Sequence, residues 1–407
     1  MYKDKKIAVI VPAYNEEKLI HKTISSVPDY VDKIIVINDN SYDNTSYILD
    51  LSKKDFSDKL IVINHSENKG VGKAIINGYK KSLELNMDIS AVMAGDAQMN
   101  PVKLPKLLDP IIDNQADYTK GNRLVSENIN NMPKIRRKGN SILTILTKIA
   151  SGYWNIMDPQ NGYTAASREV IKRIIKEKIY PRYGYCNDIL VKLNIYNFRV
   201  MDVTIPPVYN NEKSGIRLRN YTPKLSLLLT KLFFWRINKK YGSLNFHPLL
   251  IFYYLGLFLI PIGFLLGFYL LYNRIITGNY TIGSITLAAL FLILGFQFLL
   301  FGMLFDEMEN KELLKTQNNI KTKKNFFSRL KGYWGNDFHP LILFYLFGMI
   351  MLILGGVVGF IILYNRITIG TLSYTYGTLL LVVLLLILGF QSVLFAHVFE
   401  LELQKKV

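Results

Sequence analysis

Two oxygen-bearing side chains, Asp96 and Gln98, end an apolar run in the segment AVMAGDAQMNP, Ala91 to Pro101. Carboxylate and amide oxygens suit Mg2+ or Mn2+, which proteins commonly hold with one or two side chains while phosphate oxygens and water complete the coordination. A buried carboxylate with neither a cation nor a donor would be costly. The spacing therefore predicts a divalent-metal site with Asp96 and Gln98 as ligands, and Pro101 is expected to open the following helix.

Polar residues also follow two earlier apolar runs. Pro12-Ala13-Tyr14 would offer a nucleobase an aromatic face and backbone groups, and Asp39 would accept a hydrogen bond from a base N–H or a ribose hydroxyl. An aspartate at the end of a strand is also a common helix cap or turn residue, and Asn40-Ser41-Tyr42-Asp43 resembles a turn before a helix. Both interpretations of Asp39 stay open at this point.

A glycine-containing stretch, NKGVGKAIINGY from Asn68, resembles a loose phosphate-binding loop. It lacks the Gly-Lys-Ser/Thr of a Walker motif and the three glycines of a dinucleotide fingerprint. Close packing at the entry to a helix is the structural alternative for Gly70 and Gly72.

The elements that must position these residues alternate along the chain between apolar strands and helical patterns. The expected strands are 6–14, 33–39, 59–65 and 89–96, and helices are expected from Asn15, from about Asp43 and over 70–85. Such alternation predicts a Rossmann-like α/β fold, with a mostly parallel sheet and helices on both faces. Ligands of such sheets bind beyond the carboxyl ends of the strands, where the polar residues above gather.

The second half of the chain is strongly apolar. Four runs of about 25 residues, against roughly 20 needed to span a bilayer, lack Asp, Glu, Lys and Arg, namely 248–272, 280–305, 340–364 and 374–399. They predict four transmembrane helices. Seven Lys and Arg residues lie between the second and third runs, whereas the two short hairpin loops carry only Arg274 and Arg366. The positive-inside rule therefore predicts that the N-terminal domain, the basic linker and the C-terminal tail are cytoplasmic.

The membrane part contains an internal repeat. The segment NFHPLLIFYYLGLF from Asn245 matches DFHPLILFYLFGMI from Asp337, and LILGFQ occurs twice. Both hairpins carry a GxxxG spacing, which allows close helix packing and suggests a homo-oligomer. The spans hold no acid, Lys or Arg, so an ion-coupled transporter is poorly supported.

The net charge of +18 does not indicate nucleic acid, because the basic residues gather in two amphipathic stretches, 132–153 and 213–240. Basic and apolar residues at helical spacing are typical of helices on an anionic membrane surface, and an ordinary core-facing helix is the alternative. Contacts with lipid or with a lipid head group are expected for Arg136, Arg137, Lys213 and Arg217. The single cysteine, Cys186, excludes an internal disulfide.

Taken in order, Pro12-Ala13-Tyr14-Asn15-Glu16, Asn38-Asp39-Asn40-Ser41, Asn68-Lys69-Gly70 and Asp96-Ala97-Gln98 resemble the motifs of family 2 glycosyltransferases with the GT-A fold. Within that family the chain resembles polyprenyl-phosphate glycosyltransferases of the dolichyl-phosphate mannose or glucose synthase type. The resemblance covers roughly residues 7–209. Ala94 and Asn38 stand where the family has acids, and the family's late arginine is missing at 209–211.

The resemblance implies a role for each matching residue. Pro12, Tyr14, Glu16, Asp39 and Lys69 would form the nucleotide site, with Glu16 bracing its loop, while Asp96 and Gln98 would hold the metal ion. Arg123 would meet the acceptor phosphate and Asp158 would face the sugar or acceptor, so that Asp96, Arg123 and Asp158 form the catalytic set. Asp188 occupies the approximate place of an acid on the next helix, and capping of that helix is its structural alternative.

The implied reaction is an inverting, metal-dependent transfer of a sugar from a nucleoside-diphosphate sugar to polyprenyl or dolichyl phosphate at the cytoplasmic membrane face. Its product would be a lipid-linked monosaccharide for glycan or glycoprotein assembly. The alternatives are a membrane glycosyltransferase with another lipid or polysaccharide acceptor, and a non-catalytic nucleotide-binding membrane protein or carrier. The predicted organisation is a GT-A domain at 1–212, an interfacial segment at 213–243, hairpins at 244–305 and 339–407, and a basic linker at 306–338.

Overall fold

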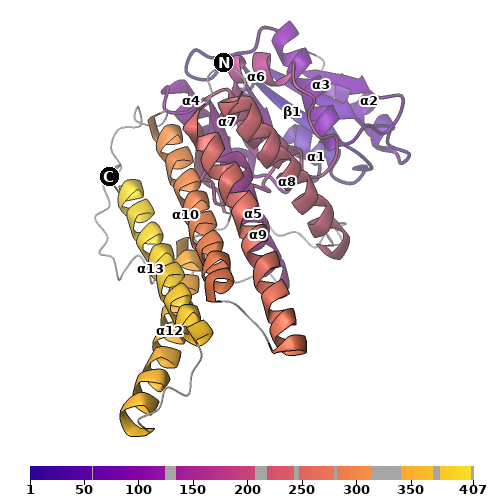
Figure 1. Ribbon diagram of the computed structural model, residues 1–407. Helices are drawn as coiled ribbons and strands as arrows, with labels where there is room; N and C mark the ends of the chain where they lie inside the picture. The colour runs from indigo at the N-terminus through magenta and orange to yellow at the C-terminus, as the bar shows by residue number, and fades with distance from the viewer. Residues whose placement is uncertain are drawn as a thin grey trace. The chain divides into compact units, whose positions relative to one another are not determined.

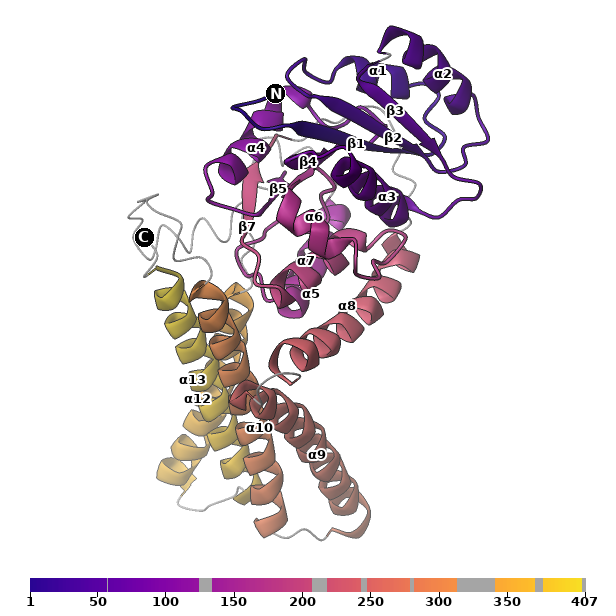
Figure 2. The same ribbon diagram turned by 90° about the horizontal axis from the view of Figure 1, so that it is seen from above.

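A computed structural model describes residues 1–56, 58–123, 134–206, 218–242, 247–278, 282–312, 341–369 and 376–404. The chain divides into two compact units, of which the first contains Met1–Lys239 and the second contains Lys240–Lys311 and Asn319–Val407. Each unit is described by itself (Figures 1 and 2).

A seven-stranded sheet organises the first unit. Its strands are β1 (Ile7–Ala13), β2 (Lys33–Asn38), β3 (Leu60–Asn64), β4 (Ile89–Val92), β5 (Tyr118–Asn122), β6 (Thr164–Ser167) and β7 (Val200–Thr204), in the order β3-β2-β1-β4-β6-β5-β7. All pairings are parallel except those of β6, which runs antiparallel to β4 and to β5. The predicted mostly parallel sheet is confirmed. The antiparallel strand is a feature that the strand–helix alternation did not predict.

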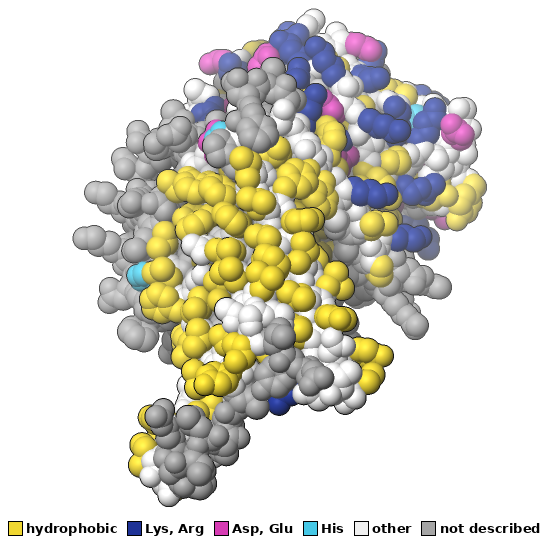
Figure 3. Space-filling view, viewed as in Figure 1, with side chains coloured by type: hydrophobic (Ala, Val, Ile, Leu, Met, Phe, Trp, Pro, Cys, Tyr) yellow, Lys and Arg dark blue, Asp and Glu magenta, His cyan; other side chains and the backbone are white. Residues whose placement is uncertain are grey.

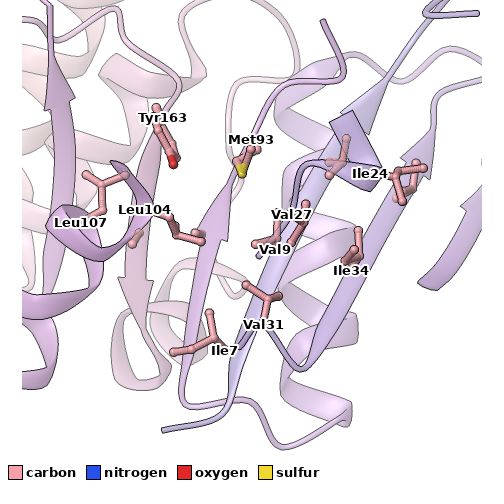
Figure 4. Close-up of a cluster of buried hydrophobic side chains, with 14 of the residues drawn as sticks. Ile7, Val9, Ile24, Val27, Val31, Ile34, Met93, Leu104, Leu107 and Tyr163 are labelled. Atoms are coloured by element: carbon pink, nitrogen blue, oxygen red, sulfur yellow. The ribbon is translucent and has the colours of Figure 1, made fainter. Parts of the chain in front are cut away.

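Helices cover both faces of this sheet because side chains alternate along each strand. On one face, Val9 and Val11 of β1 pack with α1 (Ile20–Ser25), α2 (Thr45–Asp55) and α4 (Leu104–Ile112). Figure 4 shows the labelled side chains of this cluster. On the other face, Ala8 and Ile10 pack with α3 (Val71–Glu84), α6 (Arg168–Ile174) and α7 (Tyr185–Ile195). The sheet is therefore buried on both sides, and its carboxyl edge is left for ligands.

Two longer helices complete the first unit. The core between α5 (Lys134–Ser151), α7 and α8 (Leu218–Tyr241) contains Leu225 and Leu229 of α8, which pack on Leu143 of α5 and Val191 of α7. The apolar stripe of 213–240 therefore faces this core, as the structural alternative predicted. Leu227 and Phe234 are exposed beside the exposed Lys231.

Arg236 anchors α8 to the rest of the unit. Its side chain is fully buried, and it donates to the backbone oxygens of Ala150 at 2.8 Å and Ile149 at 3.2 Å. These carbonyls belong to the last turn of α5, where backbone oxygens lack helical partners, so a cation is well placed there.

The second unit contains four long apolar helices, α9 (Pro248–Thr277), α10 (Ile282–Glu312), α12 (Leu341–Ile369) and α13 (Tyr376–Gln404). All four are long and apolar enough to cross a membrane, and only 17% to 28% of each span's apolar window is buried inside the protein. Figure 3 shows hydrophobic side chains covering the visible face of this unit. The chain is therefore a multi-pass membrane protein, as predicted.

The repeat is visible in the packing of these helices. Gly263 of α9 lies against Leu292 of α10, and the equivalent Gly355 of α12 lies against Leu386 of α13. The glutamines of the two LILGFQ copies, Gln297 and Gln391, meet at 3.4 Å between the two hairpins. The duplicated sequence therefore forms two similar hairpins.

Candidate active site

One polar cluster centres on Asp39, directly after β2. Its Oδ1 accepts from the backbone N–H of Lys69 at 2.9 Å, and its Oδ2 accepts from the N–H of Gly70 at 2.7 Å. The His65 Nδ1 lies 2.6 Å from Oδ1, and Asn77 Nδ2 lies 2.8 Å from His65 Nε2. A proton on Nδ1 satisfies both contacts, because the ring then donates to the carboxylate and accepts from the amide. Asp39 is thus fixed by three donors at the sheet edge.

The predicted Tyr14 stands on a loop that is fastened to the loop after β2. Its ring is exposed and meets the exposed ring of Tyr42 edge-to-face, with centroids 6.1 Å apart. The backbone N–H of Glu16 donates to Thr45 Oγ1 at 2.8 Å, and the N–H of Asn15 donates to Ser41 Oγ at 3.0 Å. Asn15 has a φ of 57°, a left-handed conformation that asparagine tolerates. The two loops therefore expose two aromatic rings, and the Asp39 N–H donates to the oxygen of Ala13, the residue before Tyr14, at 2.9 Å.

Glycines bring this edge close to a later segment. An added Cβ at Gly72 would lie 2.3 Å from the Tyr180 backbone oxygen, and the Gly72 N–H donates to the Pro181 oxygen at 2.8 Å. Gly70 has a φ of 85°. The N–H groups of both glycines are therefore engaged within the protein, which supports the packing interpretation of this stretch over the phosphate-loop interpretation.

Asp96 and Gln98 follow β4, which ends at Val92 and not at Asp96 as the sequence predicted. The pairing with β6 ends at Val92, whereas the chain stays beside β1 through the Met93 N–H to the Ile10 oxygen at 2.9 Å and the Gly95 N–H to the Pro12 oxygen at 3.3 Å. Asp96 Oδ1 accepts from the Gln98 N–H at 3.1 Å. Both side chains are half-exposed. Pro101 opens a 3-10 turn, η1 (Pro101–Lys103), as expected.

These two residues fit a divalent cation bound jointly with a substrate. They supply two hard oxygen ligands at the surface of the edge, and the described part of the chain contains no group of three or more His, Cys, Asp or Glu residues that would enclose a metal ion alone. A diphosphate would have to complete the coordination, as is usual for Mg2+.

Another polar cluster pairs Arg123, which follows β5, with Asp158. The guanidinium donates from Nε at 2.7 Å and from a terminal nitrogen at 3.1 Å to the two carboxyl oxygens, and the Arg123 N–H adds a contact at 3.2 Å. Burial favours a raised pKa for the Asp158 carboxyl, but the charge and hydrogen bonds of Arg123, aided by the charge of Lys120, outweigh it and lower that pKa. Asp158 is buried and Arg123 is half-exposed. The pair thus presents an oriented cation at the edge.

Beside this pair lie two buried lysines and a half-buried aspartate that the sequence did not single out. Lys120 on β5 donates to the Asn161 oxygen, Lys148 on α5 donates to the Trp154 oxygen, and Asp202 on β7 accepts from Asn122 Nδ2. A single acid inside the short apolar strand VMDVT was the available signal for Asp202. Lys148 lay inside a stretch that was interpreted as a membrane-surface helix.

Asp188 does not cap its helix. It lies in the first turn of α7, where Gly184 is the capping residue. Its carboxylate pairs with Lys192 at 2.6 Å and accepts from the Tyr180 N–H at 2.6 Å. Burial raises the pKa of Asp188, which Lys192 and the Tyr180 N–H oppose. Asp188 thereby fixes the 180–181 segment that packs on Gly70 and Gly72.

Four predicted lipid-contacting residues are not tested by these contacts. Lys213 and Arg217 lie outside the described residues, and Arg136 and Arg137 lie in α5 at positions where only the backbone is described. Pro12 lies in β1 opposite Ile37 of β2, beside the loop that carries Tyr14.

Comparisons with known proteins agree with this arrangement. The model of glycosyl transferase family 2 matches residues 8–175. A UDP-N-acetylglucosamine–dolichyl-phosphate N-acetylglucosaminyltransferase of Methanococcus voltae is 32% identical over 219 residues, which are 51% of this chain and 87% of that protein. The polyprenol monophosphomannose synthase of Mycolicibacterium smegmatis is 26% identical over 217 residues, which are 51% of this chain and 78% of that protein.

Among solved structures, glucosyl-3-phosphoglycerate synthase from Mycobacterium tuberculosis, in complex with Mn2+, UDP and glucosyl-3-phosphoglycerate, has a TM-score of 0.43 and 19% identity. That match covers 57% of this chain and 80% of that chain. The family match and the identity to the Methanococcus voltae enzyme show that this chain belongs to glycosyltransferase family 2 and is a glycosyltransferase.

Proposed function

We propose that the protein transfers a sugar from a nucleoside-diphosphate sugar to a polyprenyl phosphate at the cytoplasmic face of the membrane, with inversion at the anomeric carbon. The carrying observation is the Arg123–Asp158 pair, an oriented cation at the ligand edge of a chain that also has four membrane-spanning helices. The names of the two relatives support the acceptor class, since one acts with dolichyl phosphate and the other makes a polyprenol monophosphomannose.

The donor would lie across the carboxyl ends of β1, β2 and β4. Tyr14 would stack on the base, and Asp39, whose orientation is fixed by His65, would accept a hydrogen bond from the base or ribose. The backbone N–H of Lys69 donates to Asp39, and this contact would place Lys69 beside the nucleotide. Asp96 and Gln98 would hold Mg2+ or Mn2+, which when bound would offset the negative charge that develops on the leaving diphosphate.

The acceptor needs position more than activation. A phosphate monoester with a second pKa near about 6 is already charged at neutral pH, so it requires little help from a general base. Arg123 would align that phosphate for in-line attack on the anomeric carbon, and the ionised Asp158 would keep the guanidinium in place. Arg136, Arg137, Lys213 and Arg217, with exposed lysines of α8 such as Lys231, would guide the lipid head group.

The test presents the purified full-length protein with a polyprenyl phosphate, Mn2+ or Mg2+, and a panel of UDP- and GDP-sugars, and detects lipid-linked sugar by mass spectrometry. UDP-N-acetylglucosamine is the first donor to try, given the Methanococcus voltae relative. We expect one donor to give a lipid-linked monosaccharide, in a reaction that EDTA stops. Free sugar alone would exclude the proposed acceptor.

Matched variants test the site assignment. Asp96→Ala and Arg123→Ala should each lower turnover by at least about 100-fold, the scale of removing one group that stabilises developing charge. Asp55→Ala, an exposed acid of α2, and Arg168→Ala, whose guanidinium donates to Asn86 Oδ1 at 2.8 Å on the surface, should retain activity. Full turnover in the Asp96 or Arg123 variant would contradict the assignment.

A further inference from the structure

One carboxyl oxygen of Asp202 joins the two segments that carry the Arg123–Asp158 pair. Its Oδ2 accepts from Asn122 Nδ2 at 2.9 Å and from the Met157 N–H at 2.6 Å. Asn122 directly precedes Arg123, and Met157 directly precedes Asp158. From the neighbouring strand β7, Asp202 therefore fixes the positions of the two residues that directly precede Arg123 and Asp158.

The other oxygen of Asp202 has a different environment. Oδ1 is buried and accepts no hydrogen bond from the residues that the structure describes, although the residue as a whole keeps some exposed surface. A carboxylate with one unsatisfied buried oxygen is costly when ionised, whereas a neutral carboxyl costs less. The geometry therefore favours a proton on Asp202.

The charged groups around Asp202 act in both directions. They are Asp158, Lys120 of β5 and Lys148 of α5, while Arg123 is paired with Asp158. The pKa of Asp202 is raised to about 7, chiefly by burial and also by the charge of Asp158, while the Met157 N–H and the two lysines act to lower it. Asp202 would thus change charge near neutral pH, beside an ion pair that stays ionised.

We propose that Asp202 is a positioning residue of the acceptor site and that its neutral form is the one that lets the Arg123–Asp158 pair receive a phosphate. This inference rests on the proposed function of Arg123. With Asp202 neutral, the pair balances one cation against one anion. When Asp202 ionises, a second carboxylate stands beside Asp158 and opposes a phosphate dianion at Arg123, since like charges in a buried site repel strongly.

The affinity for the acceptor phosphate should therefore respond to pH through two groups that act in opposite directions, the phosphate itself and Asp202. A phosphate monoester becomes a dianion above about pH 6, which favours its binding to a cation. Ionisation of Asp202 above about pH 7 would weaken binding by about ten-fold, the effect of one pKa unit of coupling between two sites. Affinity for the acceptor phosphate should therefore be highest near neutral pH and fall in mild alkali.

Isothermal titration calorimetry measures the dissociation constant of a short-chain polyprenyl phosphate for the detergent-solubilised full-length protein at about pH 7.0 and about pH 8.5. The lower value lies near the pKa of Asp202, and the higher value lies more than one unit above it. The natural protein should bind about four-fold more weakly at the higher pH, because about half of Asp202 is already ionised at pH 7.0 and nearly all of it at pH 8.5. Asp202→Asn keeps an acceptor for Asn122 and Met157 but does not titrate, so its affinity should be the same at both pH values. Asp29→Asn, which removes an exposed acid, should behave as the natural protein does.

A role in folding alone would not produce this pattern. Asp202→Ala removes the tie to Asn122 and Met157 and should weaken phosphate binding at both pH values, and Asp202→Asn should restore the affinity seen at pH 7.0. If Asp202→Asn instead keeps the pH dependence of the natural protein, the inference is wrong.

Inorganic phosphate, titrated in parallel, separates this inference from the proposed acceptor. Binding of inorganic phosphate with an Asp202-dependent pH profile, without binding of the lipid, would uphold the role of Asp202 and overturn the polyprenyl acceptor. Binding of neither probe by the natural protein at either pH would overturn both.

Discussion

At the scale of single residues, the candidate site consists of side chains whose orientation is set by a second residue. Asp39 is held by His65 and by two backbone N–H groups, and Arg123 is held by Asp158. Each functional group is thereby placed before a substrate arrives, which lowers the entropy lost on binding. Substitution of a supporting residue should therefore weaken the binding of one substrate and leave the binding of the other unchanged. His65 should act on the nucleotide sugar and Asp158 on the acceptor.

His65→Ala tests this at the nucleotide side. The variant removes the 2.6 Å contact to Asp39, and a hydrogen bond to a charged group contributes about 1.5–3 kcal/mol, so the KM for the nucleotide sugar should rise by about ten-fold or more. The KM for the acceptor should not change. Steady-state kinetics with each substrate varied in turn measures both. His21→Ala, an exposed residue of α1 whose Nδ1 lies 3.1 Å from the hydroxyl of the buried Ser52, is the matched control. An equal rise in both KM values would contradict a role confined to the nucleotide.

The raised pKa of Asp202 should also make the free energy of unfolding depend on pH. Its folded-state pKa of about 7 is raised above the ordinary 3.8, so the folded state holds the proton more tightly than the unfolded chain does. Its contribution to stability is present in full below about pH 4 and is lost as the pH rises through about 7. Urea denaturation followed by tryptophan fluorescence across this range should show a decline that Asp202→Asn lacks. Identical profiles would refute the raised pKa.

At the scale of elements, close approaches between backbone segments assemble the sheet edge. α3 begins against the 180–181 segment, which Asp188 of α7 fixes, and α8 is fastened to the end of α5 by Arg236. The contacts of Gly72 and of Arg236 join residues that are more than 80 positions apart in the sequence. They determine where the nucleotide loop and the basic helices lie relative to the sheet.

Gly72→Ala should destabilise the first unit. The added Cβ would lie 2.3 Å from the Tyr180 oxygen, a backbone atom that cannot turn away, and overpacking of this kind costs about 1–3 kcal/mol. Chemical denaturation measures the loss in the free energy of unfolding. Lys73→Ala, at the exposed neighbouring position, should change stability by no more than about 0.5 kcal/mol. Equal stability of the two variants would mean that the 180–181 segment moves without cost.

Arg236→Met should loosen α8. The change leaves the Ala150 and Ile149 carbonyls without their charged donor in a buried place, which costs about 1–3 kcal/mol for each unsatisfied group. Hydrogen exchange should then be faster along α8 and in the last turn of α5. Lys231→Met, an exposed position on the same helix, should leave the exchange unchanged. Unaltered protection of α8 in Arg236→Met would show that the apolar contacts alone anchor the helix.

At the scale of the whole molecule, a glycosyltransferase domain is joined to a duplicated membrane hairpin. Each hairpin has its glycines at equivalent positions, and the two meet through Gln297 and Gln391, a hydrogen-bonded pair in apolar surroundings. Such a pair is worth about 0.6 kcal/mol on average in membrane proteins, so packing carries most of the association. The hairpins hold the active-site domain on the same membrane that would contain a polyprenyl acceptor.

The single buried cysteine makes the orientation testable. Cys186 is 5% exposed, so new surface cysteines can be labelled selectively. In intact cells a membrane-impermeant maleimide should label Thr277→Cys, at the loop end of α9, and should leave Lys54→Cys, on α2, unlabelled until the cells are permeabilised. Gel shift of the labelled protein measures both. The reverse pattern would place the catalytic domain outside the cell and exclude a cytoplasmic sugar donor.

The sequence alone determined the features that depend on local pattern. The alternation of apolar strands and helices predicted β1 to β4 with α2 and α3, because the period of buried residues is set by the geometry of each element. The apolar runs predicted the four long helices, because a bilayer requires about 20 apolar residues in succession. The ordered motifs indicated the family.

Only the tertiary structure decided which side chains of the candidate site contact one another. The contacts of Asp39 with His65, of Arg123 with Asp158, and of Asp202 with Asn122 and Met157 link residues between 26 and 80 positions apart, which no local period encodes. The end of β4 at Val92 coincides with the end of its pairing with β6, and the inward face of α8 depends on α5 and α7. Burial and long-range hydrogen bonds, which arise only when distant segments meet, therefore set the charge and orientation of the candidate site.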